Sequence, residues 1–110
     1  MNEPTEIRTY KVMECSTAHI TKHDGKLLDA RDCTMAVQNT DYGWFVYCSG
    51  VRSNRELRDA LEYFGFSRAF INLMVAARNQ GCKFLDLDCD GWVYDKFPKF
   101  DWRAVDDDIV

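Results

Sequence analysis

Long hydrophobic runs are missing from this sequence, and so are the common signatures of a cofactor site. No apolar stretch reaches the ~18 residues that a membrane span needs. The first residues, Met1–Glu6, are polar and lack the apolar centre of a signal peptide. Glycine-rich phosphate loops and G-x-S-x-G elbows are absent as well. We therefore expect no contact with membranes and no cofactor.

The cysteines contain no C-x-x-C pair and are odd in number: Cys15, Cys33, Cys48, Cys82 and Cys89. Three of them flank or lie within apolar runs, where a reduced cysteine behaves as a small hydrophobic residue. A secreted domain stapled by disulfides would show an even set of cysteines. The pattern predicts free thiols and a cytoplasmic location.

The net charge of −4 is unevenly spread along the chain. Residues 1–81 contain ten acidic and ten basic side chains, whereas residues 82–110 contain eight aspartates and only four basic residues. A nucleic-acid-binding protein normally shows a clustered charge of the opposite sign, so no direct nucleic-acid binding is expected. The acidic C-terminal third indicates either a partner with a basic surface or simply a need for solubility.

The first half of the sequence predicts three strands and one short helix. Thr9–Ser16 is rich in strand-forming residues, and Thr21 can cap a helix that extends to about Ala30. Cys33–Asn39 and Tyr42–Ser49 read as a hairpin. The second of these two strands is bulky on both faces, which predicts a central strand that is covered on both sides.

Two helices follow with clear start signals. Ser53 and Glu56 form a capping box, and Ser67 can cap the next helix. Apolar residues recur at spacings of three and four in both segments, so each helix has one buried face. Gly65 and Gly81 mark the two C-terminal ends.

The remaining sequence predicts a second hairpin. Cys82–Asp88 alternates apolar and acidic residues, Asp90-Gly91 is a turn, and Trp92–Asp95 is expected to pair back. The order β-α-β-β-α-α-β-β predicts an α+β fold, with a mostly antiparallel sheet and helices on one face. Residues 1–110 are expected to form a single domain whose ends, about 1–8 and 104–110, are frayed.

Two patterns are typical of metal sites, but neither contains a complete set of ligands. Asp86-x-Asp88-x-Asp90-Gly91 matches the first half of a calcium loop, but its twelfth position is Phe97, which has no ligand atom. The aspartates of a strand share one solvated face without any metal. Cys15, His19 and His23 have zinc-like spacing but lack a second ligand pair. We expect no metal.

An enzymatic site could be built from Ser16, His19 and Asp24 as nucleophile, base and supporting acid. A nucleophile needs a base within hydrogen-bond distance and an oxyanion site, and no such constellation is recognisable in the sequence. The leading expectation is therefore a protein without catalytic residues. A small enzyme using the Ser16–His19 segment and a metal-stabilised binding module are the alternatives.

Four segments of the sequence together resemble a known family: Ser16–Ile20, Tyr42–Phe45, Gly81–Gly91 and Phe97–Trp102. The chain looks like a family of small proteins of unknown function found in bacteria, plasmids and phages. Phe97 stands where that pattern has leucine. The resemblance supplies no catalytic residues. It implies an accessory protein in a bacterial host cell, of the kind that inhibits host defence such as restriction or CRISPR interference.

The predicted binding surface is the aromatic and acidic C-terminal part of the chain. Trp92 and Tyr94 are expected to include at least one partly exposed anchor, surrounded by aspartates. The expected binding residues are Asp86, Asp88, Asp90, Trp92, Tyr94, Asp95 and Asp101. Burial of these rings in a second small core is the alternative. The expected partner is a host protein with a basic surface, bound by a monomer or a homodimer of this chain.

Overall fold

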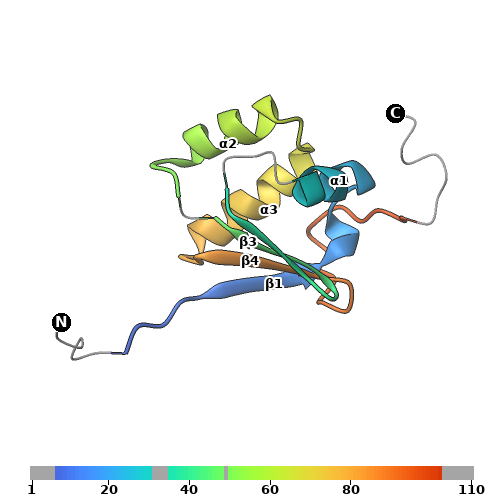
Figure 1. Ribbon diagram of the computed structural model, residues 1–110, viewed down its shortest axis with the longest axis horizontal. Coiled ribbons are helices and arrows are strands. Elements are labelled where there is room, and N and C mark those ends of the chain that lie inside the picture. The colour runs from blue at the N-terminus through green and yellow to red at the C-terminus, as the bar shows by residue number, and fades with distance from the viewer. Residues whose placement is uncertain (1–6, 31–34, 49, 103–110) are drawn as a thin grey trace.

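The computed structural model describes residues 7–30, 35–48 and 50–102, and its elements follow the predicted order up to the last strand (Figure 1). The strands are β1 (Val12–Ser16), β2 (Val37–Thr40), β3 (Gly43–Tyr47) and β4 (Phe84–Asp88). The helices are α1 (Lys22–Ala30), α2 (Asn54–Tyr63) and α3 (Arg68–Asn79), with a 3-10 turn, η1 (Thr17–His19), after β1. The predicted start of the first hairpin at Cys33 lies outside the described residues, as do most of the predicted frayed ends.

The fold is of the α+β class and its sheet is mostly antiparallel, as predicted. The strand order is β1-β4-β3-β2. β3 pairs antiparallel with both β2 and β4. β1 pairs parallel with β4, from Val12 opposite Phe84 to Ser16 opposite Asp88. The last strand therefore lies between the first and the third.

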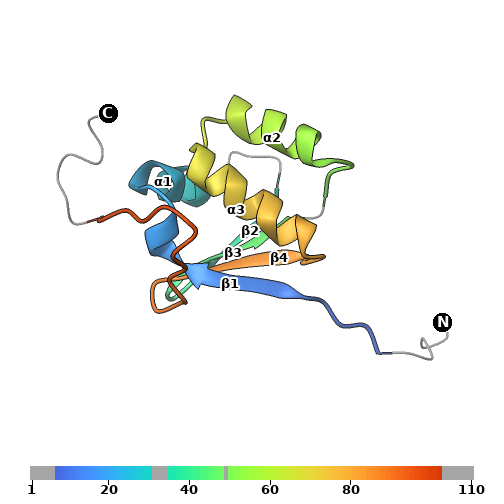
Figure 2. The same cartoon turned by 180° about the vertical axis from the view of Figure 1, so that it is seen from behind.

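The helices cover one face of this sheet, again as predicted. α3 lies across the strands and α2 lies over α3, so the molecule has three layers (Figures 1 and 2). Leu85 and Leu87 of β4 point toward the helices and are fully buried. Val46 of β3 and Phe70 of α3 are buried in the same core. This packing follows from the period of two in the strands and the apolar face of α3.

No helix of the described residues lies over the other face of the sheet, which corrects the prediction that Tyr42–Ser49 is covered on both sides. Phe45 and Tyr47 lie on this open face and are only half-buried. They pack against Phe84 of the neighbouring strand, with ring centroids 4.7 and 5.6 Å apart. Their bulk is covered by other aromatic rings rather than by a second layer.

The predicted caps are present at both long helices. Ser53 Oγ accepts a hydrogen bond from the Glu56 N–H (3.1 Å), and Ser67 Oγ accepts one from the Phe70 N–H (3.1 Å). Gly65 ends α2 at a φ of 90°, which favours glycine. None of the helices in the described ranges is long and apolar enough to cross a membrane.

Candidate functional site

Residues 89–102 follow β4 without forming a strand, which corrects the predicted pairing of Trp92–Asp95 with the strand before it. β4 already has β1 on one edge and β3 on the other. A returning strand therefore finds no free row of backbone donors and acceptors. The segment instead crosses the end of β1, where the Ser16 N–H donates to the Trp92 carbonyl (2.8 Å).

His19 holds this segment against the domain. Its ring is fully buried, Nε2 accepts the Tyr94 N–H (2.8 Å), and Nδ1 lies 2.8 Å from the Pro98 carbonyl oxygen. Because Nε2 accepts, Nδ1 carries the proton and donates to Pro98. The ring also stacks on Tyr94 and meets Phe97 edge-on. His19 is thus a clamp between η1 and a segment about 80 residues further along the chain.

Ser16, His19 and Asp24, the residues of the alternative active site, are all buried. Ser16 Oγ accepts the Ala18 N–H (3.0 Å) at the start of η1. Both ring nitrogens of His19 are engaged with backbone groups, so neither is available to Ser16. The Asp24 carboxylate accepts hydrogen bonds from the N–H (2.8 Å) and hydroxyl (2.6 Å) of Ser67. Each of the three therefore has a structural role.

Cys15, the penultimate residue of β1, is fully buried. Burial raises the pKa of its thiol to about 12, and the charges of Asp86 and Glu14 act in the same direction. Since the thiolate is the reactive form, this side chain is a poor nucleophile at neutral pH. Cys48 and Cys82 are also buried, whereas the Cys89 side chain is exposed.

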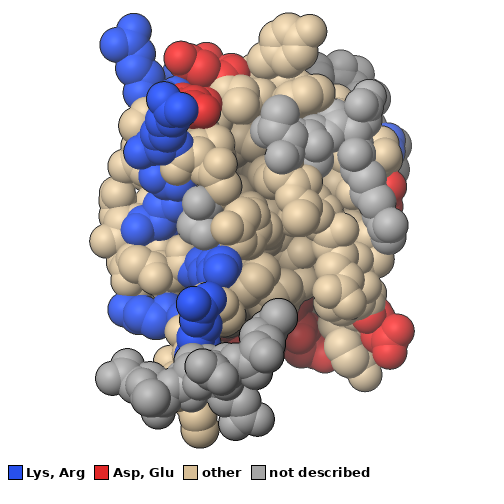
Figure 3. Space-filling model, turned by 60° about the vertical axis from the view of Figure 1, so that its left-hand side comes forward, with Lys and Arg blue, Asp and Glu red and all other residues tan. Residues whose placement is uncertain are grey.

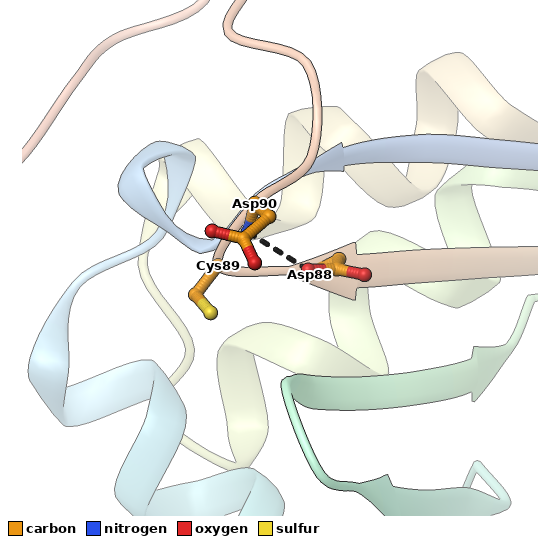
Figure 4. Close-up of side chains that lie close together, drawn as sticks. All are labelled: Asp88, Cys89 and Asp90. Atoms are coloured by element: carbon orange, nitrogen blue, oxygen red, sulfur yellow. Dashed lines mark hydrogen bonds between the residues drawn. The ribbon is translucent and has the colours of Figure 1, made fainter.

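Asp88, Cys89 and Asp90 form the turn that ends β4 (Figure 4). The Asp90 N–H donates to Asp88 Oδ1 (2.8 Å), which closes an Asx turn. One potential ligand atom from each residue lies within 4.8 Å of the others. The turn hydrogen bond accounts for this proximity. No third carboxylate of the described residues joins the cluster, so the geometry resembles half of a cation site.

Asp86 lies two residues before Asp88 in β4, on the open face of the sheet. It is opposite Glu14 of β1 in the strand register, and Asp88 follows on the same face. Partial burial raises the pKa of the Asp86 carboxyl, and the negative charges of Asp88 and Glu14 raise it further. Among the described residues no lysine or arginine forms an ion pair with these three acids, so their repulsion is uncompensated.

Trp92 is the exposed aromatic residue of this region, with 70% of its surface accessible. It follows directly after the Asp88–Asp90 turn, and Val93 beside it is 51% exposed. Tyr94 is half-buried instead, because its hydroxyl donates to the Glu14 carbonyl (2.9 Å) while its ring stacks on His19. The predicted exposure of at least one of these two rings is therefore found at Trp92, while its role as a binding anchor stays a prediction.

The two remaining predicted binding residues lie farther along the segment. Asp95 is exposed and its carboxylate is 3.8 Å from the Lys99 ammonium. Asp101 is exposed beside Trp102, whose indole N–H donates to the Ile20 carbonyl (2.8 Å). The acidic turn surface, as we call it, consists of five residues: Glu14, Asp86, Asp88, Asp90 and Trp92.

Glu14 was not predicted as part of this surface. Glu14 lies next to Asp86 only because β1 and β4 pair in parallel, and these strands are about 70 residues apart in the sequence. The available signal was weak: in the sequence of β1, Glu14 alternates with the buried Met13 and Cys15 and so must face away from the core.

Replacing Asp86 with asparagine is expected to stabilise the domain at pH 7 by a small amount. The raised pKa means that the charged carboxylate is disfavoured in the folded state. The contribution of Asp86 to the free energy of unfolding is therefore complete below the ordinary aspartate pKa, and it is lost as the pH rises through the pKa that Asp86 has in the folded protein. Asparagine removes this loss while keeping the shape. Urea unfolding at several pH values measures the effect, and the gain should shrink as the pH falls toward 3.

Asp90→Asn is the matched control for this experiment, because Asp90 is exposed and shares the same turn. If Asp86→Asn lowers the stability at pH 7, or raises it equally at pH 3, then burial and the charges of Asp88 and Glu14 do not disfavour the Asp86 carboxylate in the folded protein.

Comparison with known proteins places the domain by its sequence. Residues 12–102 match the model of a C-terminal domain described as a family of unknown function, DUF5983. This range begins with β1 and includes the acidic turn surface and the His19 clamp. No curated protein and no solved structure matches the chain. The matched range covers most of the 110 residues, so the chain belongs to the DUF5983 C-terminal domain family.

Proposed function

We propose that this domain is a non-enzymatic binding protein that docks onto a basic surface of another protein through the acidic turn surface. The observation that carries the proposal is the position of Trp92, which is 70% exposed and whose carbonyl is bound by the N–H of Ser16, the residue opposite Asp88 in the strand register. A large exposed aromatic residue with a charged rim has the composition of an interaction hot spot.

The electrostatics of the surface favour a cationic partner. Partial burial raises the pKa of Asp86, and repulsion by the charges of Asp88 and Glu14 in the free protein raises it further. A lysine or arginine from a partner would relieve the repulsion among these carboxylates. Part of the binding free energy therefore comes from removing a repulsion that is already present in the free protein. Steering by opposite charges also raises the association rate at low salt.

The biological setting that we propose is an accessory protein of a phage or another mobile element. Its target is a host nuclease or defence complex, such as one for restriction or CRISPR interference. Such targets bind nucleic acid through basic grooves, and an acidic protein surface can occupy a groove of that kind. The resemblance of the sequence to small proteins of plasmids and phages supports this setting.

Replacing Trp92 with alanine is expected to abolish most partner binding and to leave folding intact. The indole is mostly exposed, so its loss removes little core packing, whereas a hot-spot tryptophan contributes about 2 kcal/mol or more to binding. Affinity capture from a bacterial lysate with the wild-type and variant domains, followed by mass spectrometry, measures the loss. Thermal unfolding of the same two proteins measures the stability.

Tyr63→Ala is the matched control, because Tyr63 is also largely exposed but lies on α2. It should bind like the wild type. Recovery of the same proteins by the wild type and Trp92→Ala would contradict the role of this surface. A wild-type domain that captures nothing and leaves restriction and CRISPR interference unchanged would contradict the proposed function as a whole.

A further inference from the structure

The opposite end of the sheet carries a second, differently charged surface. A pocket of about 440 Å³ opens where β3 ends and β4 begins, next to the C-terminus of α3. The rings of Tyr10 and Tyr47 and the cationic side chains of Arg78 and Lys83 line it. Its size is within the range of roughly 300–1,000 Å³ that is typical of small-molecule sites. We call it the tyrosine–lysine pocket.

Figure 3 looks toward this end of the molecule. Lysine and arginine side chains form a band down one side of the view, while acidic side chains lie at its upper and lower margins. Lys11 and Lys83 come just before β1 and β4, whereas Asp86 and Asp88 lie toward the end of β4. The sheet is therefore electrically polarised along its strands. The net charge of −4, from which no nucleic-acid binding was expected, conceals this separation.

The cations around the pocket have no acidic partners among the described residues. Lys11 Nζ donates to the Gln80 carbonyl (2.8 Å). Arg78 donates through Nε to Asn54 Oδ1 (3.1 Å) and through Nη1 to the Val51 carbonyl (3.0 Å). These oxygens fix the guanidinium but leave its charge uncompensated, and its Nη2 has no partner in the described part of the chain.

Lys83 is held between two aromatic rings instead of near a carboxylate. Its Nζ is 3.9 Å from the centroid of the Tyr10 ring and 5.7 Å from that of Tyr47. Lys83 lowers the pKa of the Tyr10 phenol by hydrogen bonding and by its charge, and Arg8 adds to this effect. Positive potential is thus concentrated over an aromatic surface.

The aromatic surface continues from the pocket across the open face of the sheet. Phe84 meets Tyr10 edge-on (6.2 Å between centroids) and also contacts Tyr47 and Phe45. Within residues 7–30, 35–48 and 50–102, no helix covers this face (Figure 2). Rings beside unpaired cations are what a nucleotide requires, because its base offers a flat π surface and its phosphate a negative charge.

We propose that the tyrosine–lysine pocket binds a nucleotide, either free or as one unit of a single-stranded nucleic acid. Lys83 and the free edge of Arg78 contact the phosphate, and the base stacks on Tyr47. This surface is separate from the acidic turn surface, so the inference does not depend on the proposed function. A domain with both surfaces can contact a basic protein at one end and a nucleotide at the other.

Titration calorimetry with three probes tests the proposal on the full chain. The probes are adenosine monophosphate, a short single-stranded oligothymidylate and inorganic phosphate. Equal affinity for the two nucleotide probes indicates a free nucleotide as the ligand, and tighter binding of the oligomer, weakened by salt, indicates a single strand. Binding of inorganic phosphate as tightly as the nucleotides, or binding of none of the three, would overturn the proposal.

Variants connect the binding to the pocket. Lys83→Ala and Tyr47→Leu should each weaken nucleotide binding by roughly tenfold or more, the scale of losing one phosphate contact or one stacked ring. Lys99→Ala and Tyr63→Leu are the matched controls, because both side chains lie outside the pocket. Circular dichroism confirms that each variant is folded. A folded Lys83→Ala protein with wild-type affinity would overturn the assignment.

Discussion

Replacing Gly43 with alanine is expected to cost about 3 kcal/mol or more of folding free energy, which is a large part of a typical domain's stability. Gly43 begins β3 and pairs with Asp88. A Cβ atom placed there would lie 1.8 Å from the backbone oxygen of Leu87 and 2.9 Å from its carbonyl carbon. The obstacle is a backbone group of the neighbouring strand β4, so it cannot rotate away as a side chain could.

Urea unfolding followed by circular dichroism measures this loss, and Gly81→Ala is the matched control. A Cβ at Gly81 would have no atom within 4 Å, but the φ of 78° still costs about 1 kcal/mol for a residue with a side chain. Similar midpoints for the two variants would show that β3 and β4 separate easily at this position. The close approach would then have little importance for stability.

Replacing Asp24 with alanine is expected to destabilise the domain by about 3 kcal/mol. The Asp24 carboxylate is fully buried and has three donors: the Thr21 N–H (3.0 Å), the Ser67 N–H (2.8 Å) and the Ser67 hydroxyl (2.6 Å). Asp24 therefore completes the capping box of α1 and orients the N-cap of α3. Its removal leaves partly buried donors at the starts of two helices without this acceptor.

The change in unfolding free energy is measured for Asp24→Ala and Asp24→Asn, with Asp59→Ala as the control on an exposed helical surface. The control should lie within about 0.5 kcal/mol of the wild type. A double-mutant cycle with Ser67→Ala isolates the contact between the two caps. A coupling energy near zero would show that Asp24 stabilises α1 alone.

The local elements could be predicted because their signals are local. Ser53 and Glu56 lie three residues apart in sequence and three apart in the helix that they cap, so the sequence itself contains the interaction. The alternation in Phe84–Asp88 fixes which residues face the core without reference to any partner. The class of the fold and the face covered by helices follow from such patterns.

The arrangement of distant segments could not be predicted in the same way. The turn at Asp90-Gly91 predicted a hairpin, but whether a strand can return depends on which edges of β4 are occupied, and β1 supplies one of the neighbours. The His19 clamp and the contribution of Glu14 depend on the same long-range pairing. The exposure of Trp92 could be predicted from the sequence, because a short segment cannot bury rings on both of its faces.

The position of β4 between β1 and β3 also determines when the domain can form during synthesis. β1 ends at residue 16, and its neighbour in the sheet begins at residue 84, so at ribosomal speed β1 waits roughly 3 to 14 seconds for its partner. Until then the emerging chain has the β2–β3 hairpin and the helices, with no central strand to join them to β1. Resistance of the nascent chain to proteases should therefore appear in one step, when β4 leaves the ribosome.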